Sequence, residues 1–417
     1  MARIDLRYGS GIIPFEYDES RFEVLAAKNS HKTLTDIEIG DKLDTPIESE
    51  RLEDMITSGE TVLFVVPDAT RQTGAGQIIN LLVRRLIANG TAPHEMGIIF
   101  STGIHRAVTE AEKQDILSAF IAQRIKTLDH NARDLMQLMH VGETIGGIRV
   151  ELNRALFEFD HVVLIGGVTF HYFAGFTGGR KLVCPGLASP KTISATHKLA
   201  FDCESLDRRA GVGTGLLEGN AVHEAFVEAA SKAKISFSVN AIVNDAGEIT
   251  DLFCGDWIES HKAACEVFAD RNSTSIAEKR DLVVVSCGGY PFDLNMIQAH
   301  KSLEAASYAC SEGGTIVLLA ECRDGLGRDD FLNWFDSKDS GELAIKLCEK
   351  YQVNGQTAWS LLKKAEMYRI QVLSSLESGD SGKMRIEGTT GDEIEASLKN
   401  AKDGYIIPNG SKVWIVN

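Results

Sequence analysis

The chain has 417 residues, of which 44% are hydrophobic and 24% are charged, and its formal net charge at pH 7 is -16. A chain of this length exceeds one ordinary hydrophobic core, so we expect two domains. The acidic balance argues against a nucleic-acid or anionic-membrane partner, because a basic surface is what attracts phosphate polymers. The chain begins without a leader-like apolar segment and contains no long apolar run, so the sequence predicts a cytoplasmic protein.

The first part of the chain alternates short β-branched runs with amphipathic stretches. Buried strands are predicted over 61–66, 96–100, 161–165 and 235–243. A helix is predicted over 77–88, and Thr109 with Glu112 forms a capping box that opens another. This alternation predicts an α/β fold with a largely parallel sheet, in which ligands lie beyond the carboxyl ends of the strands. Three segments are therefore placed for function, namely 68–73, 102–106 and 166–181.

A second unit begins near Asp281. It contains predicted strands over 282–286 and 314–320 and a predicted helix over 294–311. We therefore expect an N-terminal domain over 1–270 and a C-terminal domain over 278–403. The last residues, 404–417, are expected to return to the N-terminal domain.

The eight cysteines are scattered and include no C-x-x-C pair. This spacing is not typical of a zinc site, an iron–sulfur site or a disulfide framework. Several cysteines, such as Cys184, Cys254 and Cys348, directly follow an apolar residue. We therefore expect buried free thiols.

Two histidines follow neighbouring predicted strands. His105 follows the strand over 96–100, and His171 follows the strand over 161–165. An imidazole titrates near neutral pH and so suits proton transfer in either direction. A single histidine is more often structural. Two imidazoles at neighbouring strand ends could, however, face one pocket and serve a reaction in which either enantiomer loses a proton.

The glycine-rich segment 166–199 is the most informative part of the chain. Gly175, Gly178 and Gly179 permit sharp turns and can expose backbone amides to an anion, and Lys181 follows directly. The segment does not match the phosphate-binding G-x-x-x-x-G-K-[ST] pattern. On the residues alone, Lys181 is compatible with a phosphate contact or with a covalent anchor.

A predicted helix follows the glycine-rich turns. Ser189 and Pro190 are typical of an N-cap and a first helical position, and His197 lies two turns further on. A helical histidine that faces a pocket can bind a metal, and imidazole is a good ligand for nickel. On its own, however, a histidine such as His197 is more often a core or surface residue of a helix than a metal ligand.

Two further pairs of polar side chains could bind an anion. Arg71 follows the strand over 61–66 and offers a planar fork to a carboxylate or phosphate, while Asp68 could cap the next helix or orient that arginine. Gln298 and Lys301 are three residues apart on a predicted helix and so share a face. Taken alone, each pair is better explained as an ordinary turn or an amphipathic surface.

Taken together, these segments resemble the lactate racemase family. The motifs that carry the resemblance are PDATRQT (67–73), STGIHR (101–106), GGVTFHYFAGFTGGRKLVCPG (166–186), SATHK (194–198) and GGYPFDLNMIQAHK (288–301). The long central motif is specific, whereas the others are weak singly and strong in combination. The resemblance implies two α/β domains with largely parallel sheets flanked by helices and an active site in the cleft between them.

The resemblance also implies a cofactor, a nickel-pincer nucleotide, which is a pyridinium-3,5-bis-thio mononucleotide that carries nickel. Lys181 would hold it covalently and His197 would complete the nickel site. Asp68 and the amides of Gly178 and Gly179 would help to position the nucleotide. Partner proteins would be needed to mature the cofactor.

The implied reaction is racemisation or epimerisation of a small 2-hydroxy acid. Hydride would pass reversibly from Cα to the cofactor through a 2-keto acid. His105 and His171 would exchange the hydroxyl proton. The substrate carboxylate would be held by Arg71, Gln298 and Lys301.

Four positions bear on which substrate the chain takes. Ile297 stands where relatives often have tyrosine, and Ala69 stands where the lactate enzyme has histidine. Arg180 occupies a place that is often small in the family, and Arg180 or His300 could receive a second carboxylate or face solvent. Malate, 2-hydroxyglutarate and sugar acids therefore remain alternatives to lactate.

Two other classes of function are compatible with part of the pattern. A protein that binds a hydroxy acid or nucleotide without turning it over would need neither His105 nor His171. A nicotinamide dehydrogenase is disfavoured, because no G-x-G-x-x-G follows the early strands.

Overall fold

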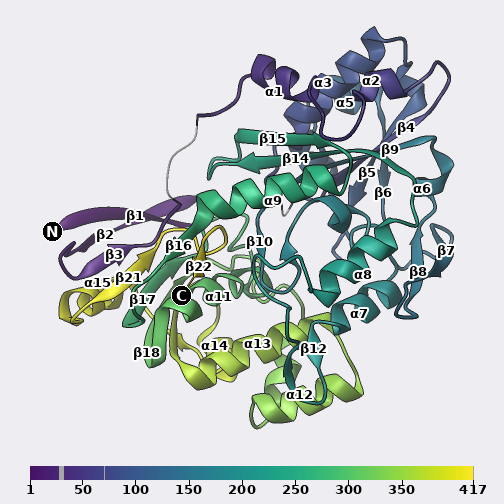
Figure 1. Cartoon of the computed structure of the whole chain (residues 1–417). Coiled ribbons are helices and arrows are strands. Elements are labelled where there is room, and N and C mark those ends of the chain that lie inside the picture. The colour runs from purple at the N-terminus through teal and green to yellow at the C-terminus, as the bar shows by residue number, and fades with distance from the viewer. Residues whose placement is uncertain (28–31, 70, 417) are drawn as a thin grey trace. The chain divides into compact units, whose positions relative to one another are not determined.

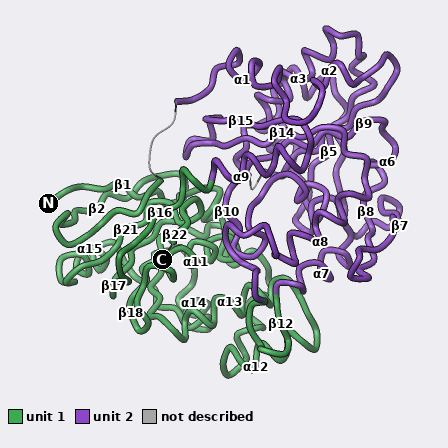
Figure 2. The backbone as a smooth tube through the Cα atoms, viewed as in Figure 1, with its two compact units in different colours: residues 1–29, 201–209, 269–417 green, residues 30–200, 210–268 purple. Residues whose placement is uncertain are grey.

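The computed structural model of the chain describes residues 1–27, 32–69 and 71–416 (Figure 1). The chain forms two compact units (Figure 2). Unit 1 comprises Met1–Asn29, Phe201–Arg209 and Ala269–Asn417, and unit 2 comprises Ser30–Ala200 and Ala210–Phe268. Each unit contains a six-stranded, largely parallel sheet, so the predicted α/β class is confirmed.

Unit 2 is built on a sheet with the strand order β15-β14-β9-β4-β5-β6. Its strands are β4 (Val62–Pro67), β5 (Met96–Ser101), β6 (Lys126–Asp129), β9 (His161–Gly167), β14 (Ile235–Val243) and β15 (Ile249–Gly255). Neighbouring strands are parallel except β14 and β15. All six residues of β4 are buried, as expected for a strand covered on both faces. The four strands predicted for this unit are confirmed to within two residues.

The helices of unit 2 pack mainly through apolar faces. They are α1 (Asp36–Leu43), α2 (Leu52–Met55), α3 (Ala75–Ala88), α4 (Glu110–Ile116), α5 (Ala119–Arg124), α6 (Ala155–Glu158), α7 (Pro190–Lys198), α8 (Ala221–Ala230) and most of α9 (Glu259–Asn272). Ile78, Leu82 and Leu86 of α3 recur at helical spacing and share a core with residues of β4, β5, β9 and β14. The predicted caps are confirmed, since Thr109 caps α4 and Ser189 caps α7.

Smaller elements complete unit 2. These are the 3-10 turns η1 (Pro93–Glu95) and η2 (Gly179–Leu182), the hairpin of β7 (Leu138–Glu143) with β8 (Arg149–Asn153), and the hairpin of β10 (Phe170–His171) with β11 (Gly175–Phe176). The turn η2 contacts β4, β9 and β14. The glycine-rich segment is therefore folded against the sheet of unit 2.

Unit 1 is built on an entirely parallel sheet with the strand order β20-β19-β18-β17-β21-β3. Its strands are β3 (Phe22–Val24), β17 (Arg280–Ser286), β18 (Cys310–Leu319), β19 (Arg369–Leu373), β20 (Glu387–Gly388) and β21 (Gly404–Ile407). The paired strands outside this sheet are β1 (Ala2–Tyr8) with β2 (Gly11–Tyr17), β12 (Phe201–Asp202) with β13 (Asp207–Arg208), and β16 (Ser273–Ser275) with β22 (Trp414–Val416).

The helices of unit 1 are α10 (Met296–Ala299), α11 (Ser302–Ala309), α12 (Ser340–Glu349), α13 (Val353–Met367), α14 (Ser378–Lys383) and α15 (Gly391–Asn400), with the 3-10 turn η3 (Phe331–Asp336). The single helix predicted over 294–311 is wrong. It is divided at His300, which ends α10, and at Lys301, which precedes α11. Among the described residues, none of the helices combines the length and apolar character needed to cross a bilayer.

The observed units divide the chain differently from the predicted domains. Residues 1–29 and 404–417 both belong with the C-terminal residues in unit 1. The physical reason is strand pairing, because β3 pairs with β21 and β21 pairs with β17 in one parallel sheet (Figure 1). The prediction that 404–417 returns to the N-terminal domain is therefore wrong.

The cysteine prediction is confirmed in part. Six cysteines are buried free thiols, namely Cys184, Cys254, Cys265, Cys287, Cys310 and Cys322. Cys203 and Cys348, however, form a disulfide with a Cα–Cα distance of 5.7 Å. The bond links the segment 201–209 to α12 within unit 1. The prediction of free thiols is therefore wrong for Cys203 and Cys348.

Candidate active site in unit 2

The end of strand β9 is shaped by two glycines. A Cβ atom at Gly166 would lie 3.1 Å from Cδ1 of Leu182, and one at Gly167 would lie 2.8 Å from Cγ2 of Thr73. The absence of side chains therefore lets both η2 and the segment after β4 approach this strand end. The glycine-rich loop and the turn that carries Asp68 and Arg71 meet at the same strand.

The hairpin of β10 and β11 holds His171 in a buried position. The side chain is 7% exposed, and its ring centroid lies 4.4 Å from that of Phe173. Nδ1 of His171 accepts a hydrogen bond from the backbone N–H of Ala174 at 3.3 Å. At Gly175, φ is +75° and a Cβ atom would lie 2.1 Å from the carbonyl oxygen of Leu216, so glycine is required at this turn. The orientation of the His171 ring thus depends on the backbone of the hairpin.

Lys181 and His197 lie against the same two aromatic rings. Nζ of Lys181 is 5.6 Å from the ring centroid of Phe173 and 5.5 Å from that of Phe226. The ring of His197 lies 5.2 Å and 5.3 Å from the same two centroids. The lysine in η2 and the histidine in α7 are therefore neighbours, although 16 residues separate them in the sequence.

His197 is held as a neutral imidazole with one nitrogen directed away from its helix. Burial and, after it, the positive charge of Lys181 lower the pKa of His197 to about 3. Nδ1 lies 2.7 Å from the carbonyl oxygen of Ile193. A carbonyl only accepts, so Nδ1 carries the proton and Nε2 keeps its lone pair. A backbone acceptor on the second nitrogen is the usual support of a metal-binding histidine.

His105 forms a pair with Asp68. Nδ1 of His105 donates to Oδ2 of Asp68 at 2.7 Å, where the imidazole is 44% exposed and the carboxylate is 9% exposed. The carboxylate fixes the proton on Nδ1 and leaves the lone pair on Nε2. The N–H of Gly103 donates to the carbonyl oxygen of Gly186 at 2.8 Å, which joins this turn to the segment that follows Lys181.

The remaining predicted residues occupy two places. Arg71 is partly buried, and its backbone N–H donates to the carbonyl oxygen of Asp68 at 3.2 Å. In unit 1, Nζ of Lys301 donates to Oε1 of Gln298 at 2.5 Å, so the two side chains are in contact, although Gln298 lies in α10 and Lys301 precedes α11 instead of sharing one helix as predicted. Unit 2 thus contains the two candidate bases, the anchor lysine and His197, while Gln298 and Lys301 belong to unit 1.

Gly178 and Gly179, which were predicted to contact the nucleotide, are also required by the packing of the loop. A Cβ atom at Gly178 would lie 3.1 Å from the carbonyl oxygen of Gly167, and one at Gly179 would lie 2.7 Å from the ring of His261. Their φ angles are +77° and +49°. Glycine is therefore required here for packing, and the role of the two amides remains a prediction.

The sequence left open whether Arg180 and His300 face solvent, and the structure shows that they do not. Arg180 is 1% exposed and His300 is 3% exposed. Burial, with the nearby charges of Lys301 and Lys364, lowers the pKa of His300 to about 3, and its Nδ1 donates to the carbonyl oxygen of Ile297 at 2.6 Å. Both side chains are enclosed within their own units.

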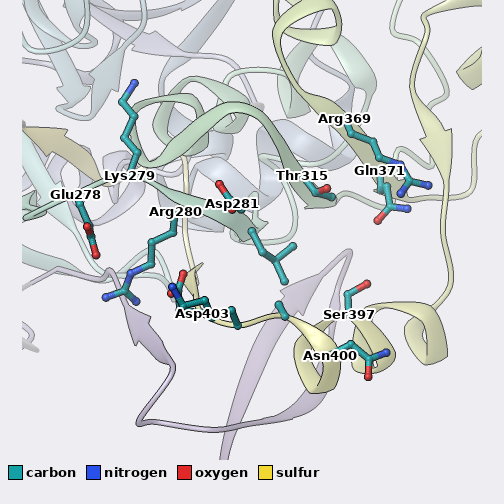
Figure 3. Close-up of a pocket in the computed structure, with 13 residues that line it drawn as sticks. Glu278, Lys279, Arg280, Asp281, Thr315, Arg369, Gln371, Ser397, Asn400 and Asp403 are labelled. Atoms are coloured by element: carbon teal, nitrogen blue, oxygen red, sulfur yellow. The ribbon is translucent and has the colours of Figure 1, made fainter.

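A pocket of about 550 Å³ in unit 1 has none of the predicted site residues among those that line it (Figure 3). It is lined by residues at the start of β17 and β19, including Arg280 and Arg369, and by Asn400 at the end of α15. Arg280 donates to the carbonyl oxygen of Gly404 at 2.9 Å, and Arg369 donates to the carboxylate of Glu387 at 2.7 Å. This pocket lies at the amino ends of the strands, opposite the edge where α/β sheets usually bind ligands.

The aromatic pair around Lys181 was missed by the sequence analysis. Phe173 lies within the central motif, but Phe226 lies in α8, and nothing in the sequence indicates that this helix returns to the loop. Within the described residues, no three His, Cys, Asp or Glu side chains converge as a metal-binding group would.

Comparisons with known proteins bear on the whole chain. The model of the lactate racemase N-terminal domain matches residues 8–207, and that of the lactate racemase C-terminal domain matches residues 276–371. A lactate racemase from Thermoanaerobacterium thermosaccharolyticum is 30% identical over 84% of this chain and 82% of its own length. A lactate racemase from Lactiplantibacillus plantarum is 33% identical over 79% of this chain and 77% of its own length.

Solved structures are similar as well. The lactate racemase apoprotein from Thermoanaerobacterium thermosaccharolyticum has a TM-score of 0.89 at 26% identity, with 100% of both chains covered. A protein from Thermotoga maritima has a TM-score of 0.73 at 19% identity, covering 93% of this chain and 100% of its own, and supports the fold alone.

Proposed function

The chain belongs to the lactate racemase family of isomerases, and from this premise we propose that it racemises or epimerises a small 2-hydroxy acid with a nickel-pincer nucleotide held on Lys181. Lactate is the first candidate substrate, because it is the substrate named for both relatives. Malate, 2-hydroxyglutarate and sugar acids are the alternatives, since Ala69 and Ile297 depart from the family pattern. We also retain the cytoplasmic location and the need for maturation proteins as predictions.

The observation that carries the proposal is the contact of Lys181 and His197 with the same two phenylalanine rings. His197 is neutral and buried, and the lone pair of its Nε2 is available, which fits a nitrogen ligand for nickel. Lys181 lies beside it on an aromatic surface, which fits a covalent anchor for a planar ring. When bound, the cofactor would supply an acceptor and donor of hydride for the interconversion of hydroxy acid and 2-keto acid.

The two histidines are assigned to the hydroxyl proton. Nε2 of His105 can accept that proton, because Asp68 holds the other nitrogen in its protonated form and stabilises the imidazolium that results. His171, whose ring is oriented by Ala174 and Phe173, is assigned to the opposite hand of the substrate. Arg71, Gln298 and Lys301 are assigned to the carboxylate, for which they provide cationic and amide donors.

Asp68, Gly178 and Gly179 are proposed to position the nucleotide, with Asp68 acting also through His105. The role of Asp68 in orienting His105 has direct geometric support, since their contact is 2.7 Å. The amides of the two glycines belong to the loop that precedes Lys181, so they are close to the anchor in the chain.

The test is a chiral assay on protein co-expressed with the cofactor's maturation proteins. Lactate, malate, 2-hydroxyglutarate and a sugar acid would each be supplied as one enantiomer, with and without deuterium at Cα. We expect racemisation with a primary isotope effect for wild type and for Lys191→Arg, an exposed lysine on α7 that serves as the control. We expect no turnover by Lys181→Arg. Racemisation by Lys181→Arg at the wild-type rate would overturn the proposal, and binding without turnover by the wild type would favour a non-catalytic binding protein.

A further inference from the structure

Arg180 is enclosed within unit 2 beside the proposed anchor. It is 1% exposed and is the largest fully buried side chain of the chain's described residues. Its Nη2 donates to the carbonyl oxygen of Ala174 at 2.7 Å, and its Nη1 lies 2.9 Å from Nε2 of His261 and 3.5 Å from the carbonyl oxygen of Gly178. Among the described residues, none of these partners is a carboxylate.

A buried cation without a counter-charge lowers the stability of the fold. The groups that it contacts therefore indicate what its role is. Burial lowers the pKa of Arg180 to about 10, which still leaves the guanidinium charged at neutral pH. The planar fork reaches carbonyl oxygens on both sides of the glycine-rich loop, Ala174 before β11 and Gly178 after it. A guanidinium suits this task because its donors point in fixed directions.

The backbone of Ala174, through the two peptide groups that flank its Cα, connects this fork to His171. The N–H of Ala174 donates to Nδ1 of His171 at 3.3 Å, and the carbonyl oxygen of Ala174 accepts from Arg180. Arg180 is also the residue that immediately precedes Lys181 in η2. One side chain therefore links the backbone that orients His171 to the turn that carries Lys181.

We propose that Arg180 is a positioning residue, which holds the imidazole of His171 and the amine of Lys181 in one fixed arrangement by binding the Ala174 and Gly178 carbonyls. This inference rests on the proposed function in that His171 and Lys181 are taken as functional groups. It adds a residue that touches neither substrate nor cofactor in the mechanism above. Loss of Arg180 should release the Ala174 peptide and, with it, the ring of His171.

The test compares Arg180→Met and Arg180→Lys with Val83→Ala. Methionine keeps much of the length without the charge, and lysine keeps the charge without the fork. Val83 is buried in α3 within the core that this helix shares with the sheet of unit 2, so its truncation lowers stability. The first measurement is on the apoprotein, as the ¹⁵N resonances of histidine-labelled chain, with His171→Gln used to assign His171.

We expect the His171 resonances to shift in both Arg180 variants and to stay in place in Val83→Ala. In matured protein we expect kcat to fall by about 10-fold or more in both Arg180 variants, with KM changed by less than about 2-fold, because geometry is lost while the substrate contacts remain. Unchanged His171 resonances in folded Arg180→Met and Arg180→Lys would overturn the inference.

The two measurements separate this inference from the proposed function. If Lys181→Arg retains full activity, the proposed function fails, yet the resonances of the apoprotein still decide whether Arg180 orients His171. A third outcome is that the resonances shift only in Arg180→Met, while Arg180→Lys keeps the wild-type resonances and kcat. The positive charge would then be sufficient without the planar guanidinium, and the inference that Arg180 acts by binding two carbonyls would be overturned.

Discussion

Arg180 in unit 2 and Glu304 in unit 1 are both buried charged groups, yet their surroundings differ. Burial alone would raise the pKa of Glu304, but the charges of Arg208 and Lys364 outweigh it and hold that pKa well below its usual range. Nζ of Lys364 lies 2.7 Å from the Glu304 carboxylate, and Arg208 donates to it as well. Arg180 has backbone carbonyls and an imidazole instead.

The comparison suggests different roles for the two charges. Glu304 stabilises the fold of unit 1, whereas Arg180 orients groups of the proposed site in unit 2. The cluster of Glu304 joins α11 and α13 to the segment 201–209, which also carries the disulfide to α12. Arg180 joins two arms of one loop beside Lys181. Replacement of Glu304 should therefore act on stability, and replacement of Arg180 should act mainly on catalysis.

The largest effect is expected for Glu304→Ala. It removes the carboxylate that pairs with both Lys364 and Arg208, and breaking a buried ion pair from one side costs about 3–5 kcal/mol. Urea denaturation followed by circular dichroism would measure the loss. Glu395→Ala, which removes an exposed pair with Lys399, is the control and should leave the midpoint unchanged. If Glu304→Ala lowered the free energy of unfolding no more than Glu395→Ala does, the claim that Glu304 stabilises the fold would be wrong.

Asp68→Asn should affect catalysis rather than stability. Asp68 is a buried carboxylate of unit 2, and it accepts a hydrogen bond from His105. Asparagine can still accept from Nδ1 but cannot stabilise an imidazolium, so kcat should fall about 100-fold, with the urea midpoint little changed. Steady-state kinetics on racemisation would measure this. A wild-type kcat in the folded variant would exclude His105 as a base that depends on Asp68.

Two buried groups, His130 in unit 2 and Glu304 in unit 1, should respond to acid in different pH ranges. Burial lowers the pKa of His130 in unit 2 to about 4, and its neutral ring accepts from Asn153 and donates to the carbonyl oxygen of Ala188. Because the folded pKa lies below the unfolded value of about 6.5, the stabilisation is present above pH 6.5 and is lost as pH falls towards 4. Glu304 of unit 1 has a lowered pKa too, but its contribution is lost only below about pH 4.5.

Urea midpoints at pH 7 and pH 5 test this difference. For the wild type, the His130 contribution should fall by on the order of 2 kcal/mol between these pH values. His130→Gln removes the titrating ring and should reduce the pH dependence by a similar amount. An identical pH dependence in the variant would show that His130 does not titrate as its burial requires.

The smallest effect on stability is expected for Arg180→Met. The variant loses hydrogen bonds to two carbonyls but also removes a buried charge that lacks a carboxylate, so the free energy of unfolding should change by no more than about 1 kcal/mol. Urea denaturation of Arg180→Met beside Glu304→Ala would show the contrast. Equal losses in the two variants would mean that Arg180 serves the fold as Glu304 does.

Local patterns predicted the sheet of unit 2 and placed Lys181 and His197 around one loop. The runs that became β4, β5, β9 and β14 are short, apolar and rich in β-branched residues, and such runs mark buried parallel strands. The cap at Ser189 fixed the start of α7, which places His197 two turns into the helix. The pairing of Lys181 with His197 was accessible because both lie in one continuous segment.

Contacts between distant segments were not accessible from local patterns. β3 and β21 join one sheet across some 380 residues, and Cys203 reaches Cys348 across a sequence separation of 145. An arginine among glycines suggests an exposed turn, and only the packing of His261 and Ala174 around it shows that Arg180 is buried. Phe226 is likewise an ordinary helix residue until α8 is placed beside η2.

The central claim is that Lys181 carries the cofactor, and peptide mass mapping tests it most directly. Protein co-expressed with the maturation proteins would be digested without prior reduction or acid treatment, and the peptide that contains Lys181 compared with that of unmatured protein. We predict a mass increment on Lys181, bound nickel in the intact protein, and loss of both in Lys181→Arg but not in Lys191→Arg. Racemase activity in matured protein whose Lys181 is unmodified would contradict the account.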